Sequence, residues 1–226
     1  MMGSFKESFI LNFIAENRYM LIVNGLFVTL QVTFFASILG IIIGFMVAFA
    51  KLSHVKVLNT LAAIYIDIIR GTPAVVQLLI MYFIIFASVN ISGVVVAIIA
   101  FGINSGAYIA EIVRAGIQAV DKGQMEAGRS LGLSHGATMR YIVIPQAIKN
   151  ILPALVNEFI ILLKETAIVG YIALEDLTKA GDIIRSRTFD PYMPLLTVAL
   201  IYLILTKILS KGLGKLERRL RQSDSR

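Results

Sequence analysis

The sequence predicts an all-α membrane protein with about five transmembrane helices. Hydrophobic residues make up 58% of its 226 residues and charged residues only 15%, and the mean hydropathy is +0.83. A soluble domain of this size needs more charge on its exterior. The hydrophobic residues also come in long runs, and about 20 such residues cross a bilayer as a helix. A few such helices use most of the chain and leave little room for a soluble catalytic domain.

The charge and the residue types exclude several classes of function. A net charge of +7 in a membrane protein sets orientation, because basic residues stay on the cytoplasmic side, so no nucleic-acid partner is expected. The chain has no cysteine and only two histidines, His54 and His135, so neither a disulfide nor a metal site is expected. Residues 1–18 lack the pattern of a cleaved signal peptide and are predicted to form an N-terminal extracytoplasmic segment.

The first two hydrophobic runs predict one continuous and one interrupted span. Residues 19–50 carry several glycines, and small residues let membrane helices approach closely. Residues 57–86 contain Gly71-Thr72-Pro73, where proline removes a helical hydrogen bond. Backbone groups freed at membrane depth must face protein or water. We therefore expect one span broken near Gly71, with a plain kink or two short interfacial helices as the alternative.

The third span is predicted over residues 93–116, with polar residues on one side. Asn104, Tyr108 and Glu111 fall at positions i, i+4 and i+7, so they share one helix face. Lipid does not tolerate such a face, and it is expected to look into the protein.

The second half of the chain predicts two more spans and a polar loop between the third and the fourth. Residues 164–192 are less hydrophobic, although their first part, residues 166–177, fits a re-entrant or interfacial helix. The predicted segments are a polar loop at 119–140 with a helical core at 122–131, spans at 141–163 and 194–209, and a basic cytoplasmic tail at 211–226. The predicted transmembrane domain is then 19–210.

Five spans place the two ends of the chain on opposite sides of the membrane. The basic tail and the basic turn at 51–56 both belong in the cytoplasm by the positive-inside rule. Counting spans places the 119–140 loop in the cytoplasm as well, and the N-terminus outside. The outer segment at 164–192 has four basic residues of its own, so the rule is obeyed only in part.

The cytoplasmic loop carries a motif with fixed spacing. It reads Gly-Gln-Met-Glu-Ala-Gly-Arg-Ser-Leu-Gly over 123–132, followed by Ile-Val-Ile-Pro over 142–145. This spacing resembles the signature loop of binding-protein-dependent ABC import permeases. The matching positions are Glu126, Ala127, Gly132, Ile142 and Pro145, whereas Gly128 stands where the family more often has alanine.

Other segments resemble the polar amino-acid branch of that family, and together the resemblance covers roughly residues 20–215. They are Arg70-Gly71-Thr72-Pro73 with Gln77, the run from Ala107 to Gly116, and Leu163-Lys164-x-Thr166. The resemblance implies a prokaryotic plasma or inner membrane, two permease copies around one path, and two ATPase subunits that bind ATP and Mg²⁺. It also implies an extracytoplasmic solute-binding protein in many members.

The motif residues suit contact with a separate ATPase. A short exposed helix between spans can sit in a cleft of another protein, and its small residues allow close approach. Glu126, near the start of this helix, suits the positive end of the helix dipole. The residues expected to couple to the ATPase are Gly123, Glu126, Ala127, Gly128, Leu131 and Gly132. On composition alone the alternative is a solvated loop with no partner.

The chain itself has no nucleotide site. Gly212-Leu213-Gly214-Lys215 is only a fragment of a phosphate-binding loop without the required spacing. We therefore expect no catalytic residues and no cofactor in this chain, and an ATPase on a separate polypeptide.

Glu158 is the sharpest indication of the substrate. A carboxylate inside a span costs about 2.5–3.5 kcal/mol, so it must be paired or wet, and an anionic group on the path favours a cationic ligand. With the polar amino-acid resemblance this favours arginine, lysine or histidine. Further candidate substrate-binding residues are Gly71, Thr72, Gln77, Asn104 and Asn157. The alternative is that Glu158 pairs internally with Arg70 or Lys164.

Other functions stay open. The same importer class fits glutamine or another polar amino acid, and an ion-coupled transporter or channel also explains polar residues inside spans. Neither an ion-coupled transporter nor a channel explains the Glu126 loop. A membrane-embedded enzyme lacks a nucleophile–base pair. A homodimer and a heterodimer with a similar permease both fit the sequence.

Overall fold

The computed structural model describes residues 5–222, and within them it contains helices and no strand. The helices are α1 (Phe5–Phe9), η1 (Ile10–Ile14), η2 (Ala15–Asn17), α2 (Tyr19–Leu52), α3 (Lys56–Arg70), α4 (Ala74–Ile80), η3 (Met81–Ile85), α5 (Gly93–Gln118), α6 (Lys122–Ser130), α7 (His135–Thr138), η4 (Met139–Val143), α8 (Ile144–Glu165), η5 (Thr166–Ile172), α9 (Leu177–Thr188) and α10 (Tyr192–Gln222).

The long helices α2 and α5 form the centre of the bundle, and small residues let them lie close together. A Cβ atom at Gly102 of α5 would lie 2.6 Å from Leu39 Cδ2 of α2. From the other side, a Cβ atom at Gly40 would lie 3.1 Å from Ser105 Cβ. Larger side chains would force the two helices apart, so these glycines set the spacing of the pair.

Within residues 5–222, three helices are long and apolar enough to cross a membrane: α2, α5 and α10. The pair α3 and α4–η3 passes the same test together but bends by 104° across residues 71–73. The predicted break at Gly71 is therefore confirmed, and it is a sharp change of direction that fits a broken span or a re-entrant loop. Helix α8 carries Lys149, Asn157 and Glu158 and is not among these candidates, so the count of five spans stays a prediction.

The structure differs from the sequence-based boundaries at two places near the C-terminus. Residues 166–177 do not form one helix: η5 ends at Ile172, Ala173 adopts φ 60°, and Asp176 caps α9. The last helix also continues to Gln222, so most of the basic tail prolongs α10. The remaining tail residues, 223–226, lie outside the described part of the chain.

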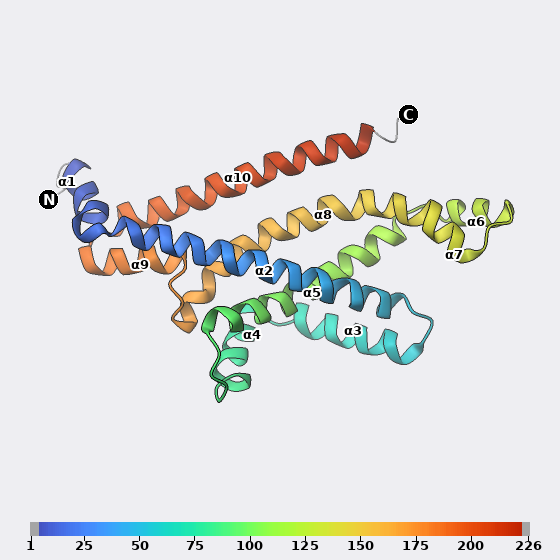
Figure 1. The fold of residues 1–226 in the computed structure, drawn as a ribbon, viewed down its shortest axis with the longest axis horizontal. Helices are drawn as coiled ribbons and strands as arrows, with labels where there is room; N and C mark the ends of the chain where they lie inside the picture. The colour runs from blue at the N-terminus through green and yellow to red at the C-terminus, as the bar shows by residue number, and fades with distance from the viewer. Residues whose placement is uncertain (1–4, 223–226) are drawn as a thin grey trace.

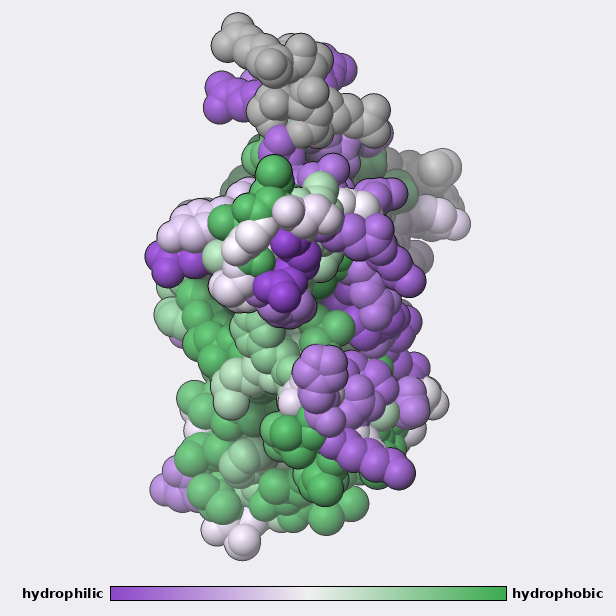
Figure 2. Space-filling model, turned by 90° about the vertical axis from the view of Figure 1, so that its right-hand side faces the viewer, coloured by the Kyte–Doolittle hydropathy of each residue, from purple (hydrophilic) through white to green (hydrophobic). Residues whose placement is uncertain are grey.

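The two ends of the elongated molecule differ in what they carry (Figure 1). The turn between α2 and α3, helices α6 and α7, and the end of α10 lie at one end, whereas α1 and α9 lie at the other. This grouping agrees with the predicted placement of the two basic segments and the 119–140 loop on one side. Figure 2 looks onto the α6–α7 end, where hydrophilic side chains gather beside a broad hydrophobic surface.

Candidate functional site

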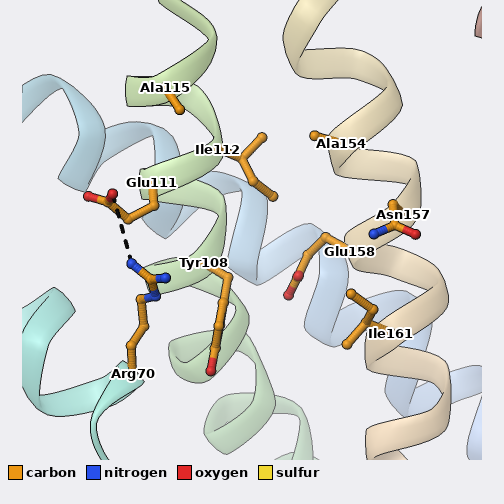
Figure 3. A pocket seen from close by; sticks show the side chains of 9 residues that line it. All are labelled: Arg70, Tyr108, Glu111, Ile112, Ala115, Ala154, Asn157, Glu158 and Ile161. Atoms are coloured by element: carbon orange, nitrogen blue, oxygen red, sulfur yellow. Dashed lines mark ion pairs between the residues drawn. The ribbon is translucent and has the colours of Figure 1, made fainter. Parts of the chain in front are cut away.

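A central pocket of about 370 Å³ lies where the end of α3 meets α5 and α8. In Figure 3, Arg70 reaches it from α3, Tyr108 and Glu111 from α5, and Asn157 and Glu158 from α8. The remaining lining residues are Ile112, Ala115, Ala154 and Ile161. The pocket therefore combines an apolar lining with charged groups from three helices, as small-molecule sites commonly do.

Glu158 lies on the α8 wall of this pocket. It is only 6% exposed, and its Oε1 accepts a hydrogen bond from Ser105 Oγ at 2.9 Å. Among the described residues Glu158 makes no ion pair, so the structure does not contain the internal pairing with Arg70 or Lys164. A buried carboxylate held by one hydroxyl keeps most of its capacity to accept further hydrogen bonds.

Arg70 lies on a different wall and is held loosely. Its Nη1 is 3.8 Å from Glu111 Oε2, and its guanidinium lies 5.4 Å from the centre of the Tyr108 ring. Glu111 has a closer partner in Arg114, whose Nε and Nη2 donate to its two oxygens at 3.0 and 2.7 Å. Since Arg114 already neutralises Glu111, the charge of Arg70 is left largely uncompensated at the pocket.

Four of the six predicted substrate-binding residues lie beside the pocket rather than on its lining. Asn157 and Glu158 line it, whereas Gly71, Thr72, Gln77 and Asn104 gather at the break between α3 and α4. There Gln77 Nε2 donates to Thr72 Oγ1 at 2.7 Å, and Asn104 Nδ2 donates to Gln77 Oε1 at 3.0 Å. Their polar groups are thus engaged with one another, and a role of these four in binding stays a prediction.

Helix α6 forms the second candidate site, at the end of the molecule seen in Figure 2. Asp121 caps it by accepting from Gly123 N at 2.7 Å, and Met125 packs against the core that contains Val113 and Val143. The predicted coupling residues Gly123, Glu126, Ala127, Leu131 and Gly132 are all exposed. Leu131 stands out among them, because 82% of this large apolar residue is exposed.

Gly128 differs from the other predicted coupling residues because it is buried. A Cβ atom there would lie 2.5 Å from Thr138 Cγ2 and 3.0 Å from Ile142 Cδ1. Its small size therefore lets α6 lie on the chain that follows it, rather than on another protein. Gly132, just after the helix, has φ +85°, a conformation that glycine adopts without strain.

A second cavity of about 360 Å³ lies between η5, α9 and α10. Lys179 Nζ is 3.2 Å from Asp182 Oδ2, and Arg185 also hydrogen-bonds to Asp182. These bonds from Arg185 and Lys179 lower the pKa of the half-buried Asp182. Asp182 is thus already bound by two cations, whereas Glu158 in the central pocket makes no ion pair among the described residues. No group of three or more potential metal ligands occurs within residues 5–222.

Residues 40–222 match the family described as the binding-protein-dependent transport system inner membrane component. The chain belongs to this family. The protein is therefore a membrane-embedded transport permease and not an enzyme, and the ATPase that drives it is a separate chain. Membership also excludes the ion-coupled transporter and the membrane enzyme that the sequence left open.

The relatives that are similar in sequence to this permease are named as amino-acid transport permeases. It is 40% identical to the arginine transport system permease protein ArtQ of Bacillus subtilis, over 90% of this chain and 94% of the relative. It is 38% identical to the glutamine transport system permease protein GlnP of Escherichia coli K12, over 89% and 93%.

Solved structures give the same fold. A crystal structure described as an amino acid ABC transporter with histidines matches with a TM-score of 0.85 and 49% identity, over 92% of this chain and 98% of that one. The methionine transporter MetNI in an inward-facing conformation matches with a TM-score of 0.77 at 22% identity, over 89% and 96%. At 22% identity, the comparison with MetNI shows only that the fold is shared.

Sequence reasoning missed Arg70 and Ser105 of this permease as parts of the site. For Arg70 two signals existed. It directly precedes the predicted break, and the polar face of Asn104, Tyr108 and Glu111 needed a polar group from another helix beside it. For Ser105 no local signal existed, since its bond to Glu158 joins residues 53 positions apart.

Proposed function

We propose that this permease forms the translocation path of an ATP-driven amino-acid importer, with arginine, lysine or histidine as its main substrates. The relatives support the amino-acid class, since their names refer to arginine and glutamine and the similar crystal structure to an amino acid transporter with histidines. They differ in the side chain that is carried, so the preference for a basic side chain depends on the pocket.

The observation that carries the proposal is the pair of opposite charges on different walls of the pocket. An amino acid carries a carboxylate and an ammonium group, and Arg70 and Glu158 offer a partner for each sign. Arg guanidinium groups suit carboxylates because they donate two parallel hydrogen bonds. With the carboxylate at Arg70, the buried anion Glu158 lies toward the rest of the ligand and favours a cationic side chain.

Glutamine remains the second candidate, and one residue favours it. Asn157 is exposed next to Glu158, and its amide can both donate to and accept from the side-chain amide of glutamine. Competition between arginine and glutamine for the same site separates the two candidates.

Helix α6 and the residues after it, up to Gly132, are proposed to dock on a dimer of ABC ATPase subunits, which bind ATP and Mg²⁺. Exposed Leu131 supplies an apolar contact at the end of α6, and Gly123, Glu126, Ala127 and Gly132 supply the small or charged surface around it. A second permease copy, identical or similar, completes the path across the membrane. An extracytoplasmic solute-binding protein delivers the amino acid at the opposite end, which carries α1 and α9.

The proposed location is the inner or plasma membrane of a bacterium, with the α6 end in the cytoplasm. Basic residues of the 51–56 turn, of the α6–α7 segment and of the end of α10 gather at this end, which the positive-inside rule places inside. The N-terminal segment 1–18 then lies outside, residues 19–210 form the permease domain, and 211–226 reach the cytoplasm.

The test replaces Glu158 with glutamine in the permease purified with its ATPase. Glu158→Gln removes the charge but keeps an oxygen that can accept from Ser105, so assembly is preserved. We expect binding of arginine and lysine to weaken at least tenfold, measured on the complex without binding protein, and ATP-driven uptake in vesicles to fall with it.

The matched control is Glu165→Gln, since Glu165 is a partly buried carboxylate of the same helix that does not line the pocket. Its binding of arginine is expected to equal that of the unmodified permease. Unchanged arginine and lysine uptake by Glu158→Gln contradicts the proposal, and tighter binding of glutamine than of arginine to the unmodified complex favours the second candidate.

A further inference from the structure

The break between α3 and α4 leaves the last carbonyls of α3 without their helical partners, and the structure supplies other donors. A helix that ends inside a protein must satisfy these carbonyls in some way. Asp67 O still accepts the ordinary helical bond from Gly71 N at 2.9 Å. The next two carbonyls each accept a side-chain hydrogen bond from beyond the helix. The bonds are Thr72 Oγ1 to Ile68 O at 2.9 Å and Gln77 Nε2 to Ile69 O at 2.7 Å.

Gln77 links the two sides of the break to α5. Its Nε2 reaches back from α4 to Ile69 O and Thr72 Oγ1, both at 2.7 Å, while its Oε1 accepts from Asn104 Nδ2 at 3.0 Å. Asn104 is only 4% exposed, so it forms a fixed point on α5. An amide is the side chain that donates and accepts at once, and this position uses both capacities.

The same face of α5 also contacts Arg70, which directly follows Ile69 in the chain. Asn104, Tyr108 and Glu111 lie at successive turns of this face, and the last two contact the Arg70 side chain. The α3 end is thus fixed to α5 at Asn104 by way of Gln77, one turn from the place where Arg70 reaches the pocket. Among the residues that the structure describes, Arg70 is held only by a 3.8 Å ion pair and a ring contact, so its position depends on the backbone beneath it.

We infer that Gln77 and Asn104 are positioning residues that hold the end of α3 so that Arg70 points into the pocket. They act through Arg70 and do not touch the ligand. This inference rests on the proposed function, in which Arg70 binds the carboxylate of the amino acid. When the Gln77 amide is lost, the Ile69 carbonyl loses its donor and the Thr72 hydroxyl keeps only its bond to Ile68 O. The last turn of α3 then shifts, and Arg70 moves off the pocket.

The test compares two ligands that differ only at the carboxylate: arginine and arginine amide. Binding of both is measured on the purified permease–ATPase complex without binding protein, so that no other protein selects between them. The ratio of the two dissociation constants reports how well Arg70 reads the carboxylate. A merely structural defect lowers the amount of folded complex and leaves this ratio unchanged.

The variants are Gln77→Met, Asn104→Leu, Arg70→Gln and the double variant of Gln77→Met with Arg70→Gln. We expect each single variant to lower the preference for arginine over its amide about tenfold, with binding of the amide changed less than twofold. The double variant is expected to match Arg70→Gln alone, because the positioning residues have nothing left to position. The control is Gln31→Met, a glutamine of α2 that does not line the pocket.

Each other outcome overturns the inference in a recognisable way. A normal preference in both Gln77→Met and Asn104→Leu shows that Arg70 is held without them. A further loss in the double variant shows that Gln77 contacts the ligand itself. A normal preference in Arg70→Gln shows that Arg70 does not bind the carboxylate. That last result removes the basis of the inference, while the outcome with Glu158→Gln still decides the proposed preference for cationic amino acids.

Discussion

The α6 segment and the central pocket differ in how their parts are brought together. The α6 segment, residues 121–132, consists of neighbours in the chain. Its caps and turns bond within a few positions, as where Gly123 N donates to Asp121 Oδ1. The pocket draws Arg70, Glu111 and Glu158 from three helices. Local bonds therefore specify much of α6, although Met125 and Gly128 also pack on later parts of the chain. The pocket exists only after α3, α5 and α8 have packed.

The two regions also expose different surfaces. Leu131 on the α6 segment is an exposed apolar side chain beside polar ones, and burying it against another protein would be favourable. The pocket places its charged groups among apolar side chains of the same chain, which suits a small charged ligand. If this comparison is right, substitutions in one region leave the function of the other intact.

The largest effect is expected from Leu131→Glu on the α6 segment. Losing an apolar anchor at a protein interface costs about 2–4 kcal/mol, and every 1.4 kcal/mol is a factor of about ten. We expect ATP-driven uptake to fall about 100-fold and co-purification of the ATPase to be lost. Arginine binding to the purified permease is expected to stay normal, and Leu131→Met serves as the apolar control. Normal uptake by Leu131→Glu breaks the comparison, because α6 would then not be the contact.

A smaller effect is expected from Gly128→Ala, which tests the inner side of α6. The added methyl group meets Thr138 Cγ2 at 2.5 Å, and overpacking of this kind costs about 1–3 kcal/mol. We expect hydrogen exchange of the α6 amides to quicken and uptake to fall about tenfold. The matched control is Gly136→Ala, where the added Cβ has no atom within 4 Å. Equal exchange in both variants contradicts a role of Gly128 in holding α6.

The sequence predicted the α6 segment, which depends on local signals, better than the central pocket, which depends on the packing of three helices. The helical core at 122–131 is confirmed as α6, and the break at Gly71 is confirmed because proline and glycine act on their own backbone. The exposure of each coupling residue was not predictable, since Gly128 looks like its small neighbours until Thr138 folds against it.

The pocket was predicted only in part, for a physical reason. Glu158 was recognisable because a carboxylate in an apolar run is costly wherever it lies. Ser105 was not recognisable, since its bond to Glu158 depends on how α5 and α8 cross. Arg70 had only the indirect signal of its place before the break, and its approach to Glu111 depends on how α3 packs on α5. The bonds among Thr72, Gln77 and Asn104 were not predictable, because a sequence lists polar side chains without showing which of them bond to each other.

The smallest effect is expected from Ser105→Ala, which removes the bond between α5 and Glu158. Ser105 Oγ donates to Glu158 Oε1 at 2.9 Å, and a net hydrogen bond contributes about 0.5–1.5 kcal/mol. Water that enters the pocket replaces part of this bond. We therefore expect arginine binding to weaken about threefold to fivefold, measured by titration of the purified complex.

The control for this variant is Ser37→Ala, which removes a buried hydroxyl whose bond stays within its own helix, to Thr33 O at 2.7 Å. Arginine binding by Ser37→Ala is expected to be unchanged, as is ATPase assembly in both variants. If Ser105→Ala binds arginine as tightly as the unmodified permease, α8 alone orients Glu158. The pocket would then resemble α6 in depending on one segment of the chain, and the contrast between the two regions would be lost.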